Sequence, residues 1–208
     1  GLAITLFMIA PMWITTKFMN IEKEALWFNL VSGAFRIMFF VVYLLVISLM
    51  KDVRRLFQYH GAEHRVVYNF ESGNDINVEN AQSFPTQHPR CGTSFLFIVL
   101  LSAILGFAFV DTVIMYFLGR ISLPIRLLFY LPMIPLVSSI GYELIKSSAK
   151  SDSLLYSLLK KPGLWLQNIT TKQPEDNMVE VSITALKEAF GDRYENMAGK
   201  EYTAEAMR

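Results

Sequence analysis

The sequence predicts an all-α membrane protein with about four transmembrane helices, and three observations lead to that prediction. Of its 208 residues, 53% are hydrophobic and 18% are charged, whereas about 25% are charged in a typical soluble domain. Apolar runs approach or exceed the roughly 20 residues that span a hydrocarbon core. The charged residues gather between these runs and after the last of them.

Four apolar runs are the candidate spans. They are Leu2–Thr16, Leu30–Met50, Ser94–Leu118 and Leu127–Ile145. The last three are long enough to cross a bilayer as helices. The first is short, and we expect it to continue upstream of Gly1, because the chain does not begin with methionine.

Basic residues are concentrated between the second and third spans and after the fourth. They are Lys51, Arg54, Arg55, Arg65 and Arg90 in the first group and Lys146, Lys150, Lys160 and Lys161 in the second. Lys and Arg bias the loops that carry them toward the cytoplasm. We therefore expect both termini of the chain to be cytoplasmic. The net charge of +1 indicates no nucleic-acid partner.

This pattern divides the chain into four segments. Residues 1–50 hold the first two transmembrane helices, and residues 94–145 hold the other two. Residues 51–93 form a cytoplasmic segment that contains the histidines and the cysteine, and residues 146–208 form a small, partly helical cytoplasmic segment.

Within the two polar segments the pattern predicts short helices separated by turns. The helix of the second span is expected to continue as far as His60. Glu71–Asp75 is a turn cluster, and Asn77 is placed to cap a short helix. Lys160–Gly163 is expected to end a short amphipathic helix, and Met178–Phe190 shows helical spacing of its apolar residues.

All three histidines and the one cysteine fall between residues 60 and 91. His60 and His64 are four residues apart, so a helix would place both imidazoles on one face, as two ligands of a divalent metal require. Glu63 completes an H-x-x-E-H string, in which it occupies the place of a general base. The alternative is an interfacial surface helix whose histidines snorkel or cap, and Gly61 lowers its helix propensity by roughly 1 kcal/mol.

A catalytic zinc site needs a third protein ligand and an open position. Glu143 ranks just above His88, because enzymes with the inverted motif take a distal acidic ligand. His88 and Cys91 have a ligand-like spacing, although the prolines around them also suit a rigid turn. Cys91, Arg90 and Arg65 are further candidates for the site. Zinc is the metal that we expect first.

Two ionisable residues, Arg36 and Asp111, lie inside predicted spans. Such residues usually face the protein interior and are candidates for a functional site. Both are predicted toward the outer half of the membrane, so we expect them to form a structural ion pair with each other.

Seven strings of the chain resemble one known family. They are Lys51–Arg55, Phe57–His64, Glu71–Gly73, Val78–Asn80, His88–Phe95, Gly163–Gln167 and Thr170–Pro174. YHGAEH and HPRCGTSF are the most specific, and the resemblance, to the YqhQ-like family of bacterial membrane proteins, covers almost the whole chain. The family has a domain of unknown function and is described as predicted metal-dependent enzymes. The resemblance therefore implies a multi-pass protein of the bacterial cell membrane.

Members of this family usually begin with a glycine-rich segment resembling GGQAVxEGVMMR, which this chain lacks. If that segment contributes to the site, we expect the present chain to be an incomplete active unit.

Two kinds of function stay open from the sequence alone. The first is a membrane-embedded metal-dependent hydrolase at the cytoplasmic surface, in which His60 and His64 hold the metal and Glu63 activates water. Its substrate would be a membrane peptide or a lipid head group. The second is a non-enzymatic membrane scaffold or assembly factor with a structural metal or a hydrogen-bonded histidine cluster. In either case the bilayer is a partner, and a membrane protein or a second copy of the chain is a further candidate partner.

Overall fold

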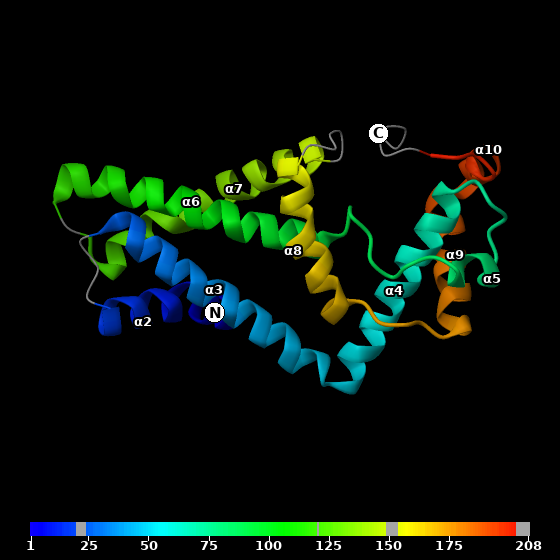
Figure 1. The fold of residues 1–208 in the computed structure, drawn as a ribbon, viewed down its shortest axis with the longest axis horizontal. Coiled ribbons are helices and arrows are strands. Elements are labelled where there is room, and N and C mark those ends of the chain that lie inside the picture. The colour runs from blue at the N-terminus through cyan, green and yellow to red at the C-terminus, as the bar shows by residue number, and fades with distance from the viewer. Residues whose placement is uncertain (20–23, 120, 149–153, 203–208) are drawn as a thin grey trace. The chain divides into compact units, whose positions relative to one another are not determined.

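The computed structural model describes residues 1–19, 24–119, 121–148 and 154–202, which are mostly helical and contain no β-strand (Figure 1). The chain folds into two compact units. The membrane unit consists of Gly1–Tyr43 and Phe95–Lys146, and the polar unit consists of Leu44–Ser94 and Ser147–Arg208. The predicted all-α class is confirmed.

The helices follow one another in a simple order along the chain. In the first half they are α1 (Leu2–Ile4), the π-helical turn η1 (Thr5–Ile9), α2 (Ala10–Met19), α3 (Ala25–Ser48), α4 (Lys51–Glu71) and α5 (Val78–Gln82). In the second half they are α6 (Gly92–Leu118), α7 (Leu123–Ser148), α8 (Leu154–Thr170), α9 (Asp176–Phe190), the 3₁₀ turn η2 (Gly191–Arg193) and α10 (Tyr194–Met197).

Among the described residues, four helical segments are long and apolar enough to cross a membrane. They are Leu2–Met19, Ala25–Ser48, Gly92–Leu118 and Leu123–Leu144. The predicted number of spans is therefore confirmed. The first is longer than the apolar run suggested, because the helix continues through Thr16 and Lys17 to Met19.

The expectation that the helix of the second span continues to His60 is wrong. α3 ends at Ser48, and Met50 adopts an extended conformation with ψ of 131° before α4 begins at Lys51. The backbone N–H groups of Leu49 and Met50 donate to carbonyls three residues earlier, at 3.2 and 3.0 Å. Such bonds tighten the last turn of a helix and end it. His60 therefore belongs to a separate helix.

The core of the membrane unit contains residues from all four candidate spans. Its buried residues are Met8, Met12, Phe28, Phe107, Tyr130 and Val137. The rings of Phe107 in α6 and Tyr130 in α7 stack with their centroids 4.0 Å apart. Aromatic stacking of this kind contributes about 0.5–1.5 kcal/mol beyond the burial of area.

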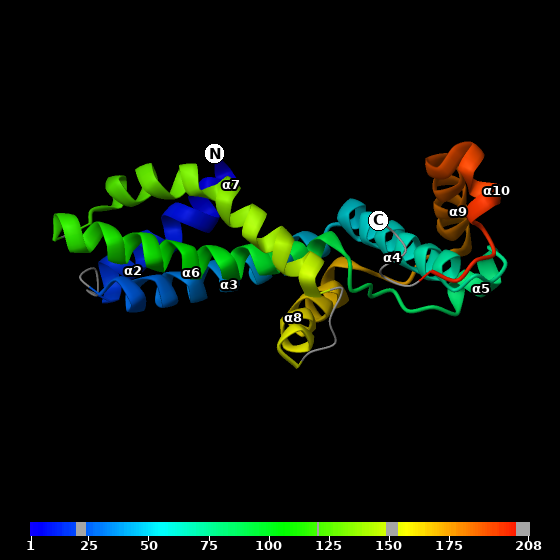
Figure 2. The ribbon, with the colours of Figure 1, turned by 90° about the horizontal axis from the view of Figure 1, so that it is seen from above.

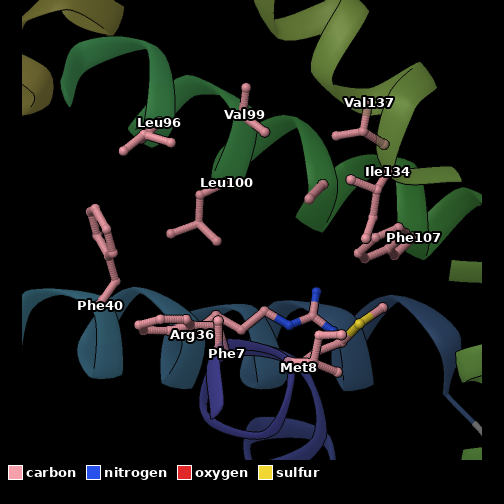
Figure 3. Close-up of a pocket in the computed structure, with 13 residues that line it drawn as sticks. Phe7, Met8, Arg36, Phe40, Leu96, Val99, Leu100, Phe107, Ile134 and Val137 are labelled. Carbon is pink, nitrogen blue, oxygen red and sulfur yellow. The ribbon is translucent and has the colours of Figure 1, made fainter. Parts of the chain in front are cut away.

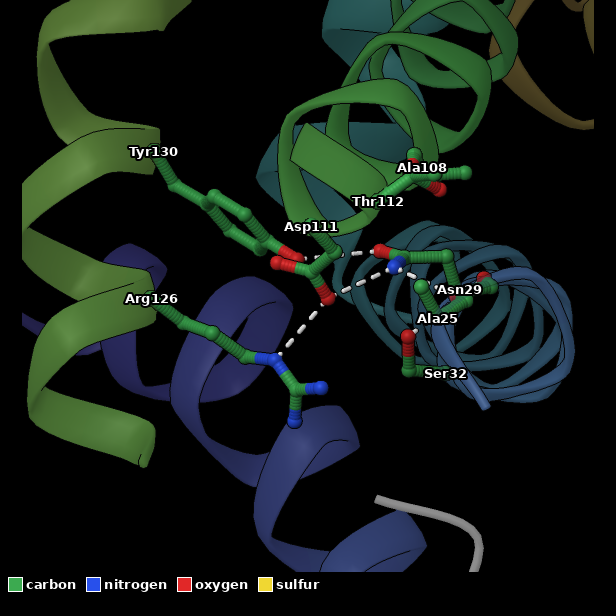
Figure 4. Close-up of polar contacts among 8 residues, drawn as sticks. All are labelled: Ala25, Asn29, Ser32, Ala108, Asp111, Thr112, Arg126 and Tyr130. Atoms are coloured by element: carbon green, nitrogen blue, oxygen red, sulfur yellow. Dashed lines mark hydrogen bonds and ion pairs between the residues drawn. The ribbon is translucent and has the colours of Figure 1, made fainter. Parts of the chain in front are cut away.

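A buried polar network links three helices of the membrane unit (Figure 4). Asp111 of α6 accepts hydrogen bonds from Arg126 Nε at 2.9 Å and from Asn29 Nδ2 at 2.8 Å, and the Tyr130 hydroxyl donates to Asn29 Oδ1 at 3.1 Å. The expected pair of Asp111 with Arg36 is therefore corrected. Because α7 begins at Leu123, Arg126 lies inside its first turn and reaches Asp111.

The polar unit has its own core, in which α4 packs against α5 and α9. Its buried residues are Ala62, Val66, Ala81, Met178, Val179 and Ile183. Figures 1 and 2 both show α9 beside the C-terminal half of α4. Two local predictions are confirmed here: the Asn77 side chain accepts from the Asn80 amide, and the helix over Met178–Phe190 is present as α9.

The predicted helix end at Lys160–Gly163 is wrong, because α8 continues through Pro162 as far as Thr170. Gly163 packs so closely on the start of α6 that a Cβ there would lie 2.8 Å from the Ser94 Cα. Proline and glycine both weaken a helix interior. Tertiary packing of this turn overrides that local preference.

Gly61 is the helix residue whose close packing matters most for the site. A Cβ at this position would lie 2.2 Å from the Lys172 carbonyl oxygen. The same segment is held on α4 by a hydrogen bond from the Lys172 amide to the Phe57 carbonyl, at 2.9 Å. Glycine is therefore required here so that the chain after α8 can approach α4.

Gly61→Ala is expected to destabilise the protein by about 1–3 kcal/mol, because the clash with backbone outweighs the gain in helix propensity. Thermal unfolding of the purified chain measures the effect. Gly92→Ala is the matched control, since a Cβ there meets nothing within 4 Å. An unchanged or raised melting temperature for Gly61→Ala would contradict this role.

Candidate metal centre

The site begins with two histidines on one face of α4. His60 and His64 lie one helical turn apart, and their ring centroids are separated by 4.4 Å. The local helix therefore produces the paired imidazoles that the spacing predicted.

Cys91 joins the two histidines from the end of the loop that precedes α6. Its sulfur lies 3.1 Å from His60 Nε2, and one ligand atom from each of the three residues lies within 4.8 Å of the others. Ligand atoms of a tetrahedral zinc site lie roughly 3.5 Å apart, given zinc–nitrogen and zinc–sulfur bonds of about 2.0 and 2.3 Å. These three residues could hold a divalent metal ion.

Backbone carbonyls orient both imidazoles. His60 Nδ1–H donates to the Thr170 carbonyl at 2.9 Å, and His64 Nδ1–H donates to the Thr86 carbonyl at 2.5 Å. In a neutral ring, each bond leaves Nε2 as the nitrogen whose lone pair a metal can take. Metal-ligating histidines in proteins are held in this way, with the second nitrogen donating to a carbonyl or carboxylate. The donor set therefore fits a metal.

The electrostatics of the group favour a thiolate ligand. Burial raises the pKa of the Cys91 thiol, but without a metal the hydrogen bonds from the protonated imidazoles of His60 and His64 and from Thr93 outweigh burial and lower the pKa to about 5. A bound metal would replace the Nε2 protons. The same hydrogen bond with Cys91 raises the pKa of His60 against the opposing effect of burial. At neutral pH Cys91 is therefore in the form that binds metals.

The three residues line a cavity of about 460 Å³. It is also lined by Glu63, Val67, Glu71, His88, Arg90 and Gly92. Ligand sites in proteins commonly measure about 300–1,000 Å³. Glu63 is exposed on the same helix as the histidines, so its carboxylate is open to solvent at this cavity.

His88 lies beside the group of three rather than within it. Its Nδ1 accepts a hydrogen bond from the Arg90 amide at 3.2 Å, so a neutral ring carries its proton on Nε2. Nε2 lies 3.6 Å from Glu71 Oε2 and has no hydrogen-bond partner among the described residues. The Arg90 guanidinium forms an ion pair with the other oxygen of Glu71. His88 is not one of the three residues whose ligand atoms converge, and its role as a metal ligand stays a prediction.

Gln167, in α8, holds the loop that carries His88, and sequence reasoning missed it. Its side chain is fully buried. Its oxygen accepts from the His88 amide at 2.7 Å, while its nitrogen donates to the His88 carbonyl at 2.9 Å and to Ser94 Oγ at 3.0 Å. A buried amide that satisfies both backbone groups of one residue fixes that residue in place. The one sequence signal for Gln167 was its position in Gly163–Gln167, one of the strings that resemble the family.

Two other candidates from the sequence are not among the residues that line this cavity. Arg65 donates instead to the side-chain oxygens of Gln82 and Gln173. Glu143 belongs to the membrane unit, where its exposed carboxylate lies 3.9 Å from Lys146 Nζ. Its role as a third ligand stays a prediction.

These features define a helical protein with four candidate membrane spans and a His₂Cys group that could hold a metal ion. The chain belongs to the family described as "Protein of unknown function (DUF1385)", which matches residues 1–192. It is 33% identical over 159 residues to "Uncharacterized protein YqhQ" of Bacillus subtilis (strain 168). That alignment covers 76% of this chain and 48% of the relative, so the chain spans about half the relative's length. No solved structure is significantly similar to the chain.

Proposed function

We propose that this protein is a membrane-bound, metal-dependent hydrolase whose centre is formed by His60, His64 and Cys91. The observation that carries the proposal is that their ligand atoms converge on the wall of a cavity that also holds Glu63. Catalytic zinc sites have three protein ligands and keep one position open, whereas structural sites have four. Zinc is the metal that this donor set favours.

The residues around the centre supply the remaining chemistry. A bound zinc ion would act as a Lewis acid and lower the pKa of water to about 7. Glu63 then accepts the proton of the attacking water, as a general base on the exposed rim of the cavity. Glu63 then passes this proton to the leaving group, while the Nε2–H of His88, beside Glu71, donates a hydrogen bond to the bound substrate.

The position of the centre suggests the class of substrate. Cys91 directly precedes α6, which is one of the four candidate spans. A centre at the end of a span lies at the membrane surface. A membrane peptide or a lipid head group, cleaved at an amide or ester bond, therefore suits the site better than a soluble metabolite.

Metal analysis of the intact chain tests the proposal directly. Purified without chelators and analysed by mass spectrometry of its metals, the protein is expected to carry about one divalent ion per chain. The His60→Ala, His64→Ala double variant, purified in parallel, corrects for metal bound elsewhere. Equal metal content in the two preparations, after incubation with zinc, would contradict the proposed metal centre.

The proposed orientation places the polar unit and both termini in the cytoplasm, as the distribution of basic residues favours. In a Cys91→Ser background, a cysteine introduced at Asn74 is expected to react with an impermeant maleimide only after the cells are permeabilised. A cysteine at Ser122, in the loop between α6 and α7, is the matched control and should react in intact cells. The reverse labelling pattern would overturn the orientation.

A further inference from the structure

Arg36 is a buried charge in the membrane unit that forms no ion pair or hydrogen bond with any described residue. Its side chain is 2% exposed, and none of its three guanidinium nitrogens has a hydrogen-bond partner among the described residues. It lies near the middle of α3, about 17 Å from either end at 1.5 Å per residue. A spanning α3 therefore places this guanidinium near the centre of the bilayer.

The surroundings of Arg36 do not compensate its burial. Its guanidinium carbon lies 5.2 and 5.9 Å from the ring centroids of Phe107 and Tyr130, which attract a cation but accept no conventional hydrogen bond. Asp111, whose Oδ2 accepts from Arg126 and Asn29, attracts the charge of Arg36 but forms no hydrogen bond with it among the described residues. Arginine does not lose its charge in proteins. A buried charge is costly unless it is paired, so the arrangement calls for an anionic partner from outside the described chain.

Arg36 lines a cavity of about 410 Å³ whose other walls are apolar. Figure 3 shows the Arg36 side chain lying along α3 on the floor of the cavity, with Leu96 and Leu100 of α6 on the opposite wall. Arg36 is the one charged side chain among the described residues that line the cavity. An apolar cavity of this size with one polar group matches the general form of a small-molecule site.

We propose that this cavity binds a single acyl chain that ends in a carboxylate, a free fatty acid, with the carboxylate paired to Arg36. The apolar walls take the chain, and a guanidinium binds a carboxylate through two parallel hydrogen bonds. A fatty acid can enter the hydrocarbon region as the neutral acid, and its proton is released to water when the carboxylate pairs with Arg36. A phospholipid phosphate keeps its charge, and the cost of desolvation holds it at the membrane surface, far from Arg36.

Competition binding to the full chain in phosphatidylcholine nanodiscs tests the proposal. Tritiated palmitate is the probe, and unlabelled palmitate, methyl palmitate and phosphatidylglycerol are the competitors. The methyl ester has the same chain without the charge, so we expect it to compete at least about tenfold more weakly than palmitate. Equal competition by the ester, or displacement by phosphatidylglycerol as strong as by palmitate, would overturn the proposal.

Three variants complete the experiment. Arg36→Met is expected to lower palmitate affinity to the level of the methyl ester. Ala103→Leu fills the cavity and should weaken binding while Arg36 is unchanged. Lys146→Met removes an exposed cation of the same unit outside the cavity and should bind like the wild type. Wild-type affinity in both Arg36→Met and Ala103→Leu would contradict the site. If Arg36→Met does not fold, the proposal is still tested by the competition of methyl palmitate against palmitate and by the affinity of Ala103→Leu for palmitate.

Discussion

His64→Ala is expected to lower the affinity of the protein for zinc by more than about 100-fold. Loss of a residue that merely supports a metal ligand changes affinity about 10–100-fold, so loss of a ligand should exceed that range. His64 Nε2 is directed at the group because Nδ1 is engaged by the Thr86 carbonyl. Zinc titration of the purified 208-residue chain, in the presence of a competing chelator, measures the change.

His88→Ala is the matched control for this experiment. His88 also lines the cavity, but its Nδ1 accepts from the Arg90 amide, which leaves the proton on Nε2. The backbone of residue 88 stays held by Gln167, so we expect the variant to fold and to keep its zinc. Cys91→Ser should behave like His64→Ala. If His88→Ala lost zinc and Cys91→Ser retained it, His88 rather than Cys91 would be the third ligand.

Glu63→Gln is expected to keep the fold and the metal but to lower activity by about 10²–10⁴, because the amide has the same shape and cannot accept a proton. Glu63 is exposed, so no buried partner is lost in this variant. Complementation of a strain that lacks the gene measures activity while the substrate is unidentified. Zinc content of the same variant shows that the centre is intact.

Glu79→Gln is the control, because Glu79 is an exposed carboxylate of the same unit, in α5, outside the cavity. It should complement as well as the wild type does. If Glu63→Gln also complements fully while His60→Ala does not, the metal would be structural. It would then fasten the loop that ends at Cys91 to α4, and the protein would be a membrane scaffold rather than a hydrolase.

The local sequence pattern was sufficient to predict much of the secondary structure of this protein. The apolar runs predicted four spans because a helix must be long and apolar to cross a bilayer, whatever its neighbours are. The cap of α5 by Asn77 and the helix over Met178–Phe190 depend on residues within a few positions of one another. The pairing of His60 with His64 is likewise a property of one helical turn.

Contacts between distant residues decided the rest. Cys91 meets the histidines because Gln167 holds the intervening loop, and a residue 76 positions away from Cys91 leaves no trace in local spacing. Asp111 pairs with Arg126 instead of Arg36 because the start of α7 places Arg126 inside the bundle. α8 passes through Pro162 because packing of Gly163 on Ser94 outweighs local helix preference. Sequence spacing reports neighbours along one helix, whereas burial and pairing across helices depend on how the helices pack.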